Sequence, residues 1–215
     1  MPVPLKIDFV SDISCPWCVI GLRALEQAIA RLDGQVAVDL HFQPFELNPQ
    51  MPPGGQDIDE HLQQKYGSTP EQAALVRERI RAAGAALGFT FSLQTRSRIY
   101  NTFDAHRLLH WAALEGRQLA LKQALFQAYF TDGEDPSSHQ VLIRAAARVG
   151  LDATRAARIL DSNEFAAVVR KEQAFFLDQG IHAVPAVIIN NQHLIQGGQP
   201  VEVFEQALRQ IAGLA

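Results

Sequence analysis

Hydrophobic and polar positions alternate at the start of the chain and then change to a helical spacing. Residues 5–10 have the sequence LKIDFV, an alternating run rich in strand formers, which predicts a β-strand. From residue 20 to residue 32, apolar side chains recur every three or four positions, which predicts a helix. Residues 36–45 alternate again and place Val36, Val38, Leu40 and Phe42 on one face. Two strands joined by a helix predict a right-handed βαβ unit with parallel strands.

The middle of the chain has a helical pattern. A connector rich in proline and glycine lies within residues 47–56 and marks a boundary. Beyond it, alanine and arginine are frequent and β-branched residues are few. Residues 68–71, Ser-Thr-Pro-Glu, form a helix start signal. The apolar spacing predicts helices over residues 57–66, 70–87, 101–116, 118–131, 137–149, 152–160 and 163–179.

Strand character returns near the C-terminus. Residues 184–189 form an apolar run typical of a buried strand, Asn190-Asn191 predicts a hairpin turn, and residues 193–196 predict the return strand. A Gly-Gly-Gln-Pro segment then leads into an amphipathic helix predicted over residues 201–212.

The two strand-forming ends of the chain can share one sheet, which predicts an α/β fold. In this arrangement residues 1–56 and 163–215 form one discontinuous domain. Residues 57–162 form a helical domain inserted into it.

Composition and charge exclude several classes of protein. The chain has 215 residues, of which 47% are hydrophobic and 20% charged, as in ordinary globular proteins. A net charge of −4 argues against a dedicated nucleic-acid binder, which would present a basic face. No apolar run approaches the roughly 18 residues of a membrane span. The first strand begins near residue 5 and leaves no room for a secretory signal, so we expect a cytoplasmic protein.

The chain has only two cysteines, and they stand three positions apart in Cys15-Pro16-Trp17-Cys18. Pro16 suits the first turn of the helix that follows, so Cys15 lies at the positive end of that helix, where a thiolate is stabilised. Cys18 lies one turn further on and can attack a mixed disulfide formed on Cys15. In the cytoplasm such a pair is usually catalytic or sensory. The pattern therefore predicts redox chemistry at Cys15 and Cys18.

Other interpretations of this motif were weighed. A structural zinc site needs about four ligands, and the chain has no second CxxC and only scattered histidines, so no metal is expected. Trp17 either packs on the helix surface or offers an apolar contact to a partner beside the sulfurs.

The order of these elements, with a CxxC after the first strand and a Val-Pro opening the third, resembles the thioredoxin superfamily. The helical insertion resembles the DsbA family. Residues 11–21 (SDISCPWCVIG), 101–112 (NTFDAHRLLHWA) and 183–200 (AVPAVIINNQHLIQGGQP) are similar to its FrnE-like branch. The resemblance covers nearly the whole chain. It implies a thioredoxin-like fold with a large all-helical insertion.

The resemblance also implies a function, that of a thiol–disulfide oxidoreductase. Cys15 would be the nucleophile and Cys18 the resolving cysteine, with Pro16 and Trp17 tuning the reduction potential. Val184-Pro185 would be a cis-proline loop facing the sulfurs. The substrates would be disulfides or dithiols of proteins or small molecules. No cofactor is expected beyond the redox-active disulfide itself, with glutathione a candidate co-substrate. In a reducing cytosol we expect reductase or isomerase action more than net oxidation.

Several further residues are candidates for the site. Asp8 is a weak candidate for the buried acid that such sheets carry beneath the cysteines, because its spacing to Cys15 is one residue too long and a one-residue slip changes the face of a strand. Asp12 is expected to make at most a turn bond.

Five residues further along the chain have either a site role or a structural one. Asn101, His106 and His110 either line a groove between the helical block and the redox domain or fill the core, and the i, i+4 spacing of the histidines puts them on one helix face. Gly198 and Gln199 either bind an anion such as a glutathione carboxylate or form a tight turn.

Two rival functions stay open. A glutathione-dependent isomerase or transferase, resembling 2-hydroxychromene-2-carboxylate isomerase and the kappa-class glutathione transferases, shares this fold and needs no second cysteine, so Cys18 argues against it. A non-enzymatic redox-sensing or metal-buffering module is the other.

Overall fold

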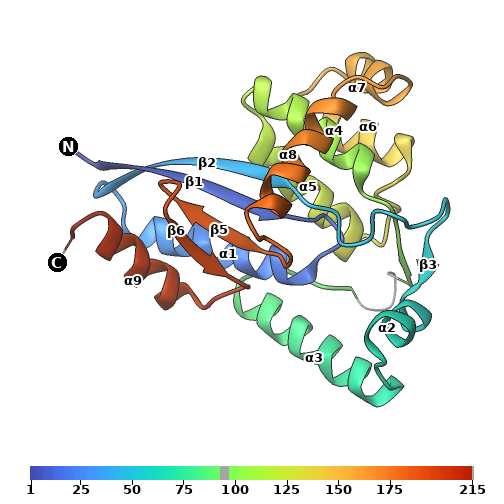
Figure 1. Ribbon diagram of the computed structural model, residues 1–215, viewed down its shortest axis with the longest axis horizontal. Helices are drawn as coiled ribbons and strands as arrows, with labels where there is room; N and C mark the ends of the chain where they lie inside the picture. The colour runs from blue at the N-terminus through green and yellow to red at the C-terminus, as the bar shows by residue number, and fades with distance from the viewer. Residues whose placement is uncertain (93–96, 215) are drawn as a thin grey trace.

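The computed structural model describes residues 1–92 and 97–214 and has a four-stranded sheet at its centre (Figure 1). The strand order is β2-β1-β5-β6. Strand β1 (Val3–Ser11) pairs parallel with β2 (Val36–Pro44) and antiparallel with β5 (Ala186–Ile189), which pairs in turn with β6 (His193–Gln196). Helix α1 (Pro16–Arg31) joins β1 to β2. The predicted βαβ unit and the predicted hairpin therefore share one sheet.

Helices cover both faces of the sheet. Helices α1 and α9 (Val201–Ile211) lie on one face, and α8 (Ala166–Asp178) crosses the other (Figure 1). Alternate residues of β1 point to the two sides, because side chains alternate along a strand. Leu5, Ile7 and Phe9 belong to the large core that includes α1, whereas Val10 packs in a smaller cluster with Phe176 of α8.

A block of helices lies beside the edge strand β2. It contains α4 (Phe103–Leu114), α5 (Gln118–Phe126), α6 (His139–Arg148) and α7 (Ala153–Leu160), and α5 continues as a short π-helix over Gln127–Thr131. The side chain of Gln118 accepts the Phe42 N–H and donates to the Phe42 carbonyl, each at 2.9 Å. This amide pairs with the open edge of β2 and fixes α5 against it.

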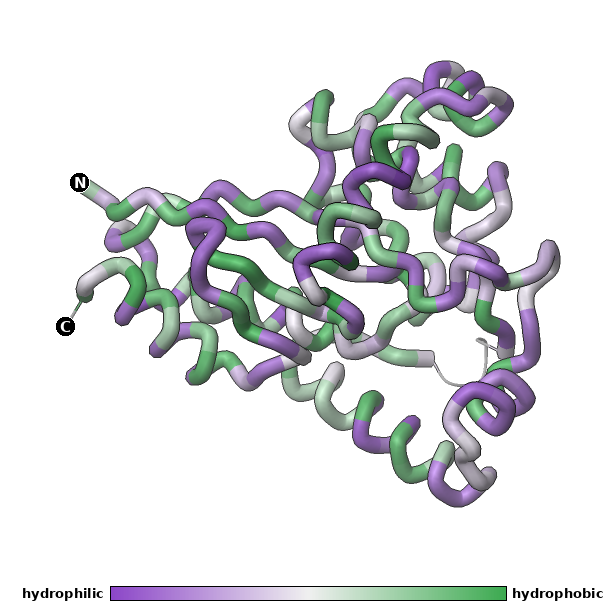
Figure 2. The backbone as a smooth tube through the Cα atoms, viewed as in Figure 1, coloured by the Kyte–Doolittle hydropathy of each residue, from purple (hydrophilic) through white to green (hydrophobic). Residues whose placement is uncertain are grey.

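The remaining helices lie on the other side of the dithiol. Helix α2 (Ile58–Tyr66) is largely hydrophilic, in contrast to the central strands (Figure 2). Helix α3 (Pro70–Ala86) begins at the predicted signal, with Thr69 and Gln72 forming a reciprocal capping box. Within the described part of the chain, no helix has both the length and the apolar character needed to cross a bilayer.

The structure departs from the predicted elements in two places. Strands β3 (Gln56–Asp57) and β4 (Arg98–Ile99) form a second small sheet that the sequence did not predict, because two residues are too few to show a period. Helix α8 begins at Ala166 and not at residue 163, because Phe165 before it has a left-handed backbone with φ of 62°. The hairpin turn is confirmed by φ values of 52° and 56° at Asn190 and Asn191.

Candidate active site at the CPWC dithiol

The two cysteines occupy the start of α1 as free thiols. Cys15 is the N-cap residue and Pro16 the first residue of the helix. The Cys15 Sγ donates to the Val184 carbonyl at 3.6 Å, and the Cys18 N–H donates to the Cys15 carbonyl at 3.1 Å. Cys18 is fully buried. Burial raises the pKa of the Cys18 thiol well above its ordinary value, and the hydrogen bond to Cys15 raises it further. Cys18 therefore requires a stabilising charge nearby if it is to ionise at neutral pH.

The Val184–Pro185 peptide bond is cis, and its loop meets α1 beside the dithiol. A side chain at Gly21 would place its Cβ 3.0 Å from Pro185 Cγ, and one at Gly198 would come 3.0 Å from the Trp17 carbonyl. Glycine at both positions therefore lets the proline loop and the turn before α9 pack directly on the first turns of α1.

The Gly-Gly-Gln-Pro segment has a structural role. Gly197 has a φ of 80°, and the Gln199 side chain donates to the Gln196 carbonyl at 2.7 Å, which closes the turn. Together with the close approach of Gly198 to α1, these contacts correspond to the tight-turn interpretation of this segment.

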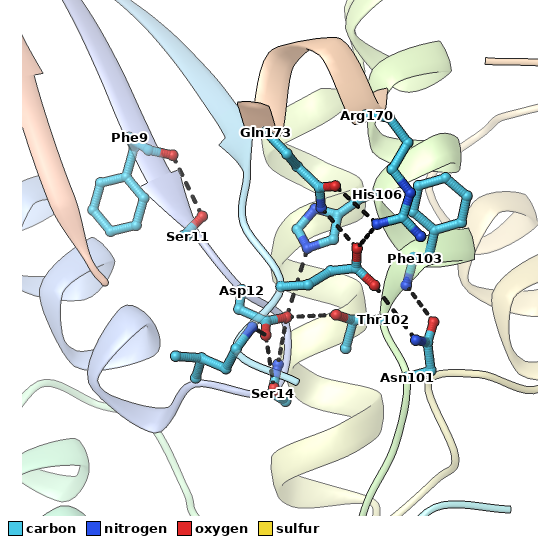
Figure 3. A network of polar contacts seen from close by, with 12 residues as sticks. Phe9, Ser11, Asp12, Ser14, Asn101, Thr102, Phe103, His106, Arg170 and Gln173 are labelled. Carbon is cyan, nitrogen blue, oxygen red and sulfur yellow. Dashed lines mark hydrogen bonds and ion pairs between the residues drawn. The ribbon is translucent and has the colours of Figure 1, made fainter. Parts of the chain in front are cut away.

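Asp12 is a central residue of the site, and the expectation that it makes only a turn bond was wrong. Its buried carboxylate accepts hydrogen bonds from the Ser14 N–H and hydroxyl, the Leu47 N–H at 2.7 Å and the Thr102 hydroxyl at 2.7 Å (Figure 3). The His106 Nε2 lies 3.6 Å away. Burial alone would raise the pKa of Asp12, but the neighbouring His106 imidazole and the Leu47 and Thr102 donors lower it to about 2. Asp12 is therefore a fixed anion behind the dithiol.

Asp8 lies on the opposite face of the sheet. Its carboxylate accepts from the Lys6 ammonium and from the Gln43 amide, each at 2.6 Å, and it borders a groove under α8 with Phe175 and Ile188. The dithiol packs with Phe9 in the core on the α1 side. The structure therefore does not bring Asp8 to the cysteines, as the one-residue difference in spacing suggests.

Asn101 belongs to a second polar network, centred on the buried Glu46 (Figure 3). The Asn101 amide donates to Glu46 at 3.4 Å, and its carbonyl oxygen accepts the Phe103 N–H at 2.9 Å. Gln173 of α8 donates to Glu46 at 3.0 Å, and Arg170 forms an ion pair with it. The network ties α8 and the start of α4 to the segment after β2, so Asn101 helps to position these helices.

His106 and His110 border a cavity of about 140 Å³ between β2, α4, α5 and α8. Gln118 and Lys122 of α5 line it as well. The His110 Nδ1 lies 3.3 Å from Glu172 of α8. Both histidines thus lie where the helical block meets the redox half of the molecule.

Two further residues near the dithiol were missed from the sequence. Lys122 is fully buried, with its Nζ 5.1 Å from the ring centre of Phe126. Its position between Leu121 and Leu125, on the apolar side of α5, is the signal that could have revealed it. Tyr66 at the end of α2 is largely exposed. Partial burial of its phenol and the charge of Cys15 raise the pKa of Tyr66. The inserted helices therefore contribute two ionisable side chains that interact electrostatically with the cysteines.

Comparison with known proteins agrees with this arrangement. Residues 6–209 match the model of the DSBA-like thioredoxin domain. A probable DsbA oxidoreductase from Streptomyces coelicolor is 32% identical, with a TM-score of 0.91 over 97% of this chain and 90% of that one. The uncharacterized protein YwbO of Bacillus subtilis is 26% identical over 97% of this chain and 96% of its own length.

A more distant structure shares the fold. The cytosolic disulfide reductase DsbM from Pseudomonas aeruginosa, solved with glutathione, is 18% identical, with a TM-score of 0.68 over 97% of this chain and all of that one. The family match, the 32% identity and the Cys15–Cys18 pair lead to one conclusion: the chain belongs to the DSBA-like thioredoxin domain family and is a DsbA-like thiol–disulfide oxidoreductase.

Proposed function

We propose that this protein reduces or isomerises disulfides more than it introduces them, that it belongs to the FrnE-like branch, and that it works in the cytoplasm. The exchange chemistry of the proposal rests on the asymmetry of the dithiol. Both thiols are buried, but Cys15 is the N-cap residue beside the Val184 carbonyl, whereas Cys18 lies one turn further on with no exposed surface. This arrangement suits attack by the first sulfur and resolution by the second.

The reaction proceeds in two exchange steps. The Cys15 thiolate attacks one sulfur of a substrate disulfide, so that the Cys15–substrate bond forms, the substrate S–S bond breaks, and one substrate thiolate leaves. Cys18 then loses its proton and attacks the Cys15 Sγ, which releases the second substrate thiolate and leaves a Cys15–Cys18 disulfide. Two electrons pass from the dithiol to the substrate.

The direction of electron flow is supported by two observations. The only cysteines in the sequence are those of the CPWC motif, so the fold needs no structural disulfide and no oxidising compartment. The shared fold with a cytosolic disulfide reductase that binds glutathione supports glutathione as the reductant that regenerates the dithiol.

A reduction potential and two cysteine variants test the proposal. Equilibration in glutathione buffers should give a Cys15–Cys18 potential nearer the value of about −270 mV of thioredoxin than the −120 mV of the oxidant DsbA. A potential close to the second value would refute net reduction. In insulin reduction, Cys15→Ala should be inactive, and Cys18→Ala should accumulate mixed disulfides on Cys15. Equal trapping through either sulfur would show that the roles are reversed.

The cysteine variants also separate this function from its rival. A glutathione-dependent isomerase or transferase needs no resolving cysteine, so it would keep its turnover in Cys18→Ala. We expect turnover to be lost.

A further inference from the structure

Lys122 is a charged side chain without exposed surface. Among residues 1–92 and 97–214, its ammonium finds no hydrogen-bond partner. Its described contacts include the rings of Phe42 and Phe126, with centres 5.7 Å and 5.1 Å from the Nζ. A cation taken out of water in this way costs several kcal/mol unless a negative charge compensates it. The structure therefore has to supply a compensating anion.

Three anionic or ionisable groups act on Lys122. Cys18 has the largest effect, followed by Asp12 and Cys15. The Asp12 carboxylate is already held by donors from Ser14, Leu47 and Thr102, all of which lie outside α5. The dithiol is thus the partner whose charge changes during the reaction.

The influence is mutual. Burial lowers the pKa of Lys122 to about 8, against the opposing effect of Cys18, Asp12 and Cys15. In the reverse direction, burial and Cys15 raise the pKa of Cys18, and the charge of Lys122 lowers it. Each charge stabilises the other, as two coupled groups must.

We propose that Lys122 is the buried counter-charge of the Cys18 thiolate and accelerates the resolving step. This inference rests on the proposed disulfide exchange. In that step the Cys18 S–H gives its proton to solvent, the thiolate forms a bond to the Cys15 Sγ, and the bond from Cys15 to the substrate sulfur breaks, with the electron pair leaving on the substrate thiolate. Lys122 is a positioning residue: it forms no bond and stabilises the charge that develops on Cys18.

The cavity beside Lys122 gives it access to protons. Its walls carry the titratable groups His41, His106, His110 and Glu172 in addition to Lys122. A volume of about 140 Å³ exceeds the roughly 15 Å³ that one water needs, and the polar walls provide partners for several waters. The ammonium can therefore exchange its proton as the external pH changes.

The size of the effect follows from the chemistry of thiolates. A nearby cation lowers the pKa of an acid by roughly one to three pH units. Each unit gives about ten times more thiolate, but the nucleophilicity of that thiolate falls with a Brønsted coefficient of about 0.4–0.5. The net gain is about threefold for one unit and about tenfold for two.

The two release phases of a coloured aromatic disulfide, dithiobis-nitrobenzoate, test the inference by stopped flow. The first phase, attack by Cys15, depends on reagent concentration. The second, resolution by Cys18, does not. If the first phase is absent in the wild type, the proposed function fails. If both phases occur, the second tests Lys122 separately.

The second phase should respond to charge at position 122. In Lys122→Met it should slow about three- to tenfold at neutral pH and approach the wild-type rate well above pH 8, where the wild-type lysine is itself neutral. Lys122→Arg stays charged at every pH of the assay. It should therefore keep the wild-type rate of the second phase at neutral pH, and its pH profile should show no change of slope near pH 8. The exposed Lys171→Met is the matched control and should behave as the wild type. If the second phase has the same rate in the wild type and in Lys122→Met at neutral pH, the inference is wrong.

A measurement on the wild type does not depend on the variants folding. The chain has four lysines, so the Lys122 Nζ can be followed by NMR through a pH titration. Its pKa should be higher in the reduced protein than in the disulfide form, because the Cys15 and Cys18 charges that raise it are absent from a disulfide. The same pKa in both forms would refute the coupling.

Discussion

Replacing Asp12 by asparagine tests how much the buried carboxylate contributes to stability. The Asp12 carboxylate accepts four hydrogen bonds, two at Oδ1 and two at Oδ2. At each oxygen one donor is a backbone N–H and the other is a hydroxyl. An asparagine keeps one acceptor oxygen and turns an NH₂ group toward the donors at the other position. In either orientation of the amide, one backbone N–H therefore loses its acceptor, and the hydroxyl beside it has to turn from donating to accepting.

The magnitude follows from the pKa of Asp12. Its value of about 2 in the folded protein lies nearly two pH units below the ordinary value of 3.8. Such a difference corresponds to about 2 kcal/mol of folding free energy at pH 7. Because the folded-state pKa is the lower one, this stability is complete above about pH 5 and is lost as the pH falls toward 2. Asp12→Asn lacks this contribution at every pH.

Urea unfolding followed by tryptophan fluorescence measures the difference. Asp12→Asn should be less stable than the wild type by about 2–3 kcal/mol at pH 7, and by about half as much near pH 3. The exposed Asp33→Asn is the matched control and should change stability by less than about 0.5 kcal/mol. The reasoning would be refuted if the loss of unfolding free energy in Asp12→Asn were as small as in the control, or if it did not change with pH.

The remaining predictions concern the fold around the site. Asp8→Asn should leave the pH profile of insulin reduction unchanged, because Asp8 lies on the α8 face; a shifted profile would return it to the mechanism. Gln118→Ala should destabilise the protein by about 1–2 kcal/mol in urea unfolding, because two hydrogen bonds to Phe42 are lost at the edge of β2, and an unchanged midpoint would contradict this docking role. Gly198→Ala should lower the melting temperature and slow disulfide exchange, because its Cβ would lie 3.0 Å from the Trp17 carbonyl; wild-type values for both would show that the turn can shift away.

Much of the fold could be predicted from local patterns. The periods of β1, α1 and β2, the capping box of α3 and the Asn190-Asn191 turn depend on residues close together in the chain, so the sequence contains all the information needed to place them. The dithiol could be predicted for the same reason, because a CxxC at a helix start is a local motif.

The surroundings of the dithiol depended on the tertiary structure. Thr102 reaches Asp12 across 90 positions of sequence. Lys122 acts on the dithiol only because α5 packs against the edge of β2. A one-residue difference in register decides that Phe9, and not Asp8, faces α1.

The sequence by itself determined where strands and helices form and which sulfurs react, because those properties arise within a few turns of backbone. Only the packing of the helical insertion on the sheet decided which charges are buried beside those sulfurs. The pKa of a buried group is set by neighbours in space and by the exclusion of water, and neither is encoded in spacing along the chain.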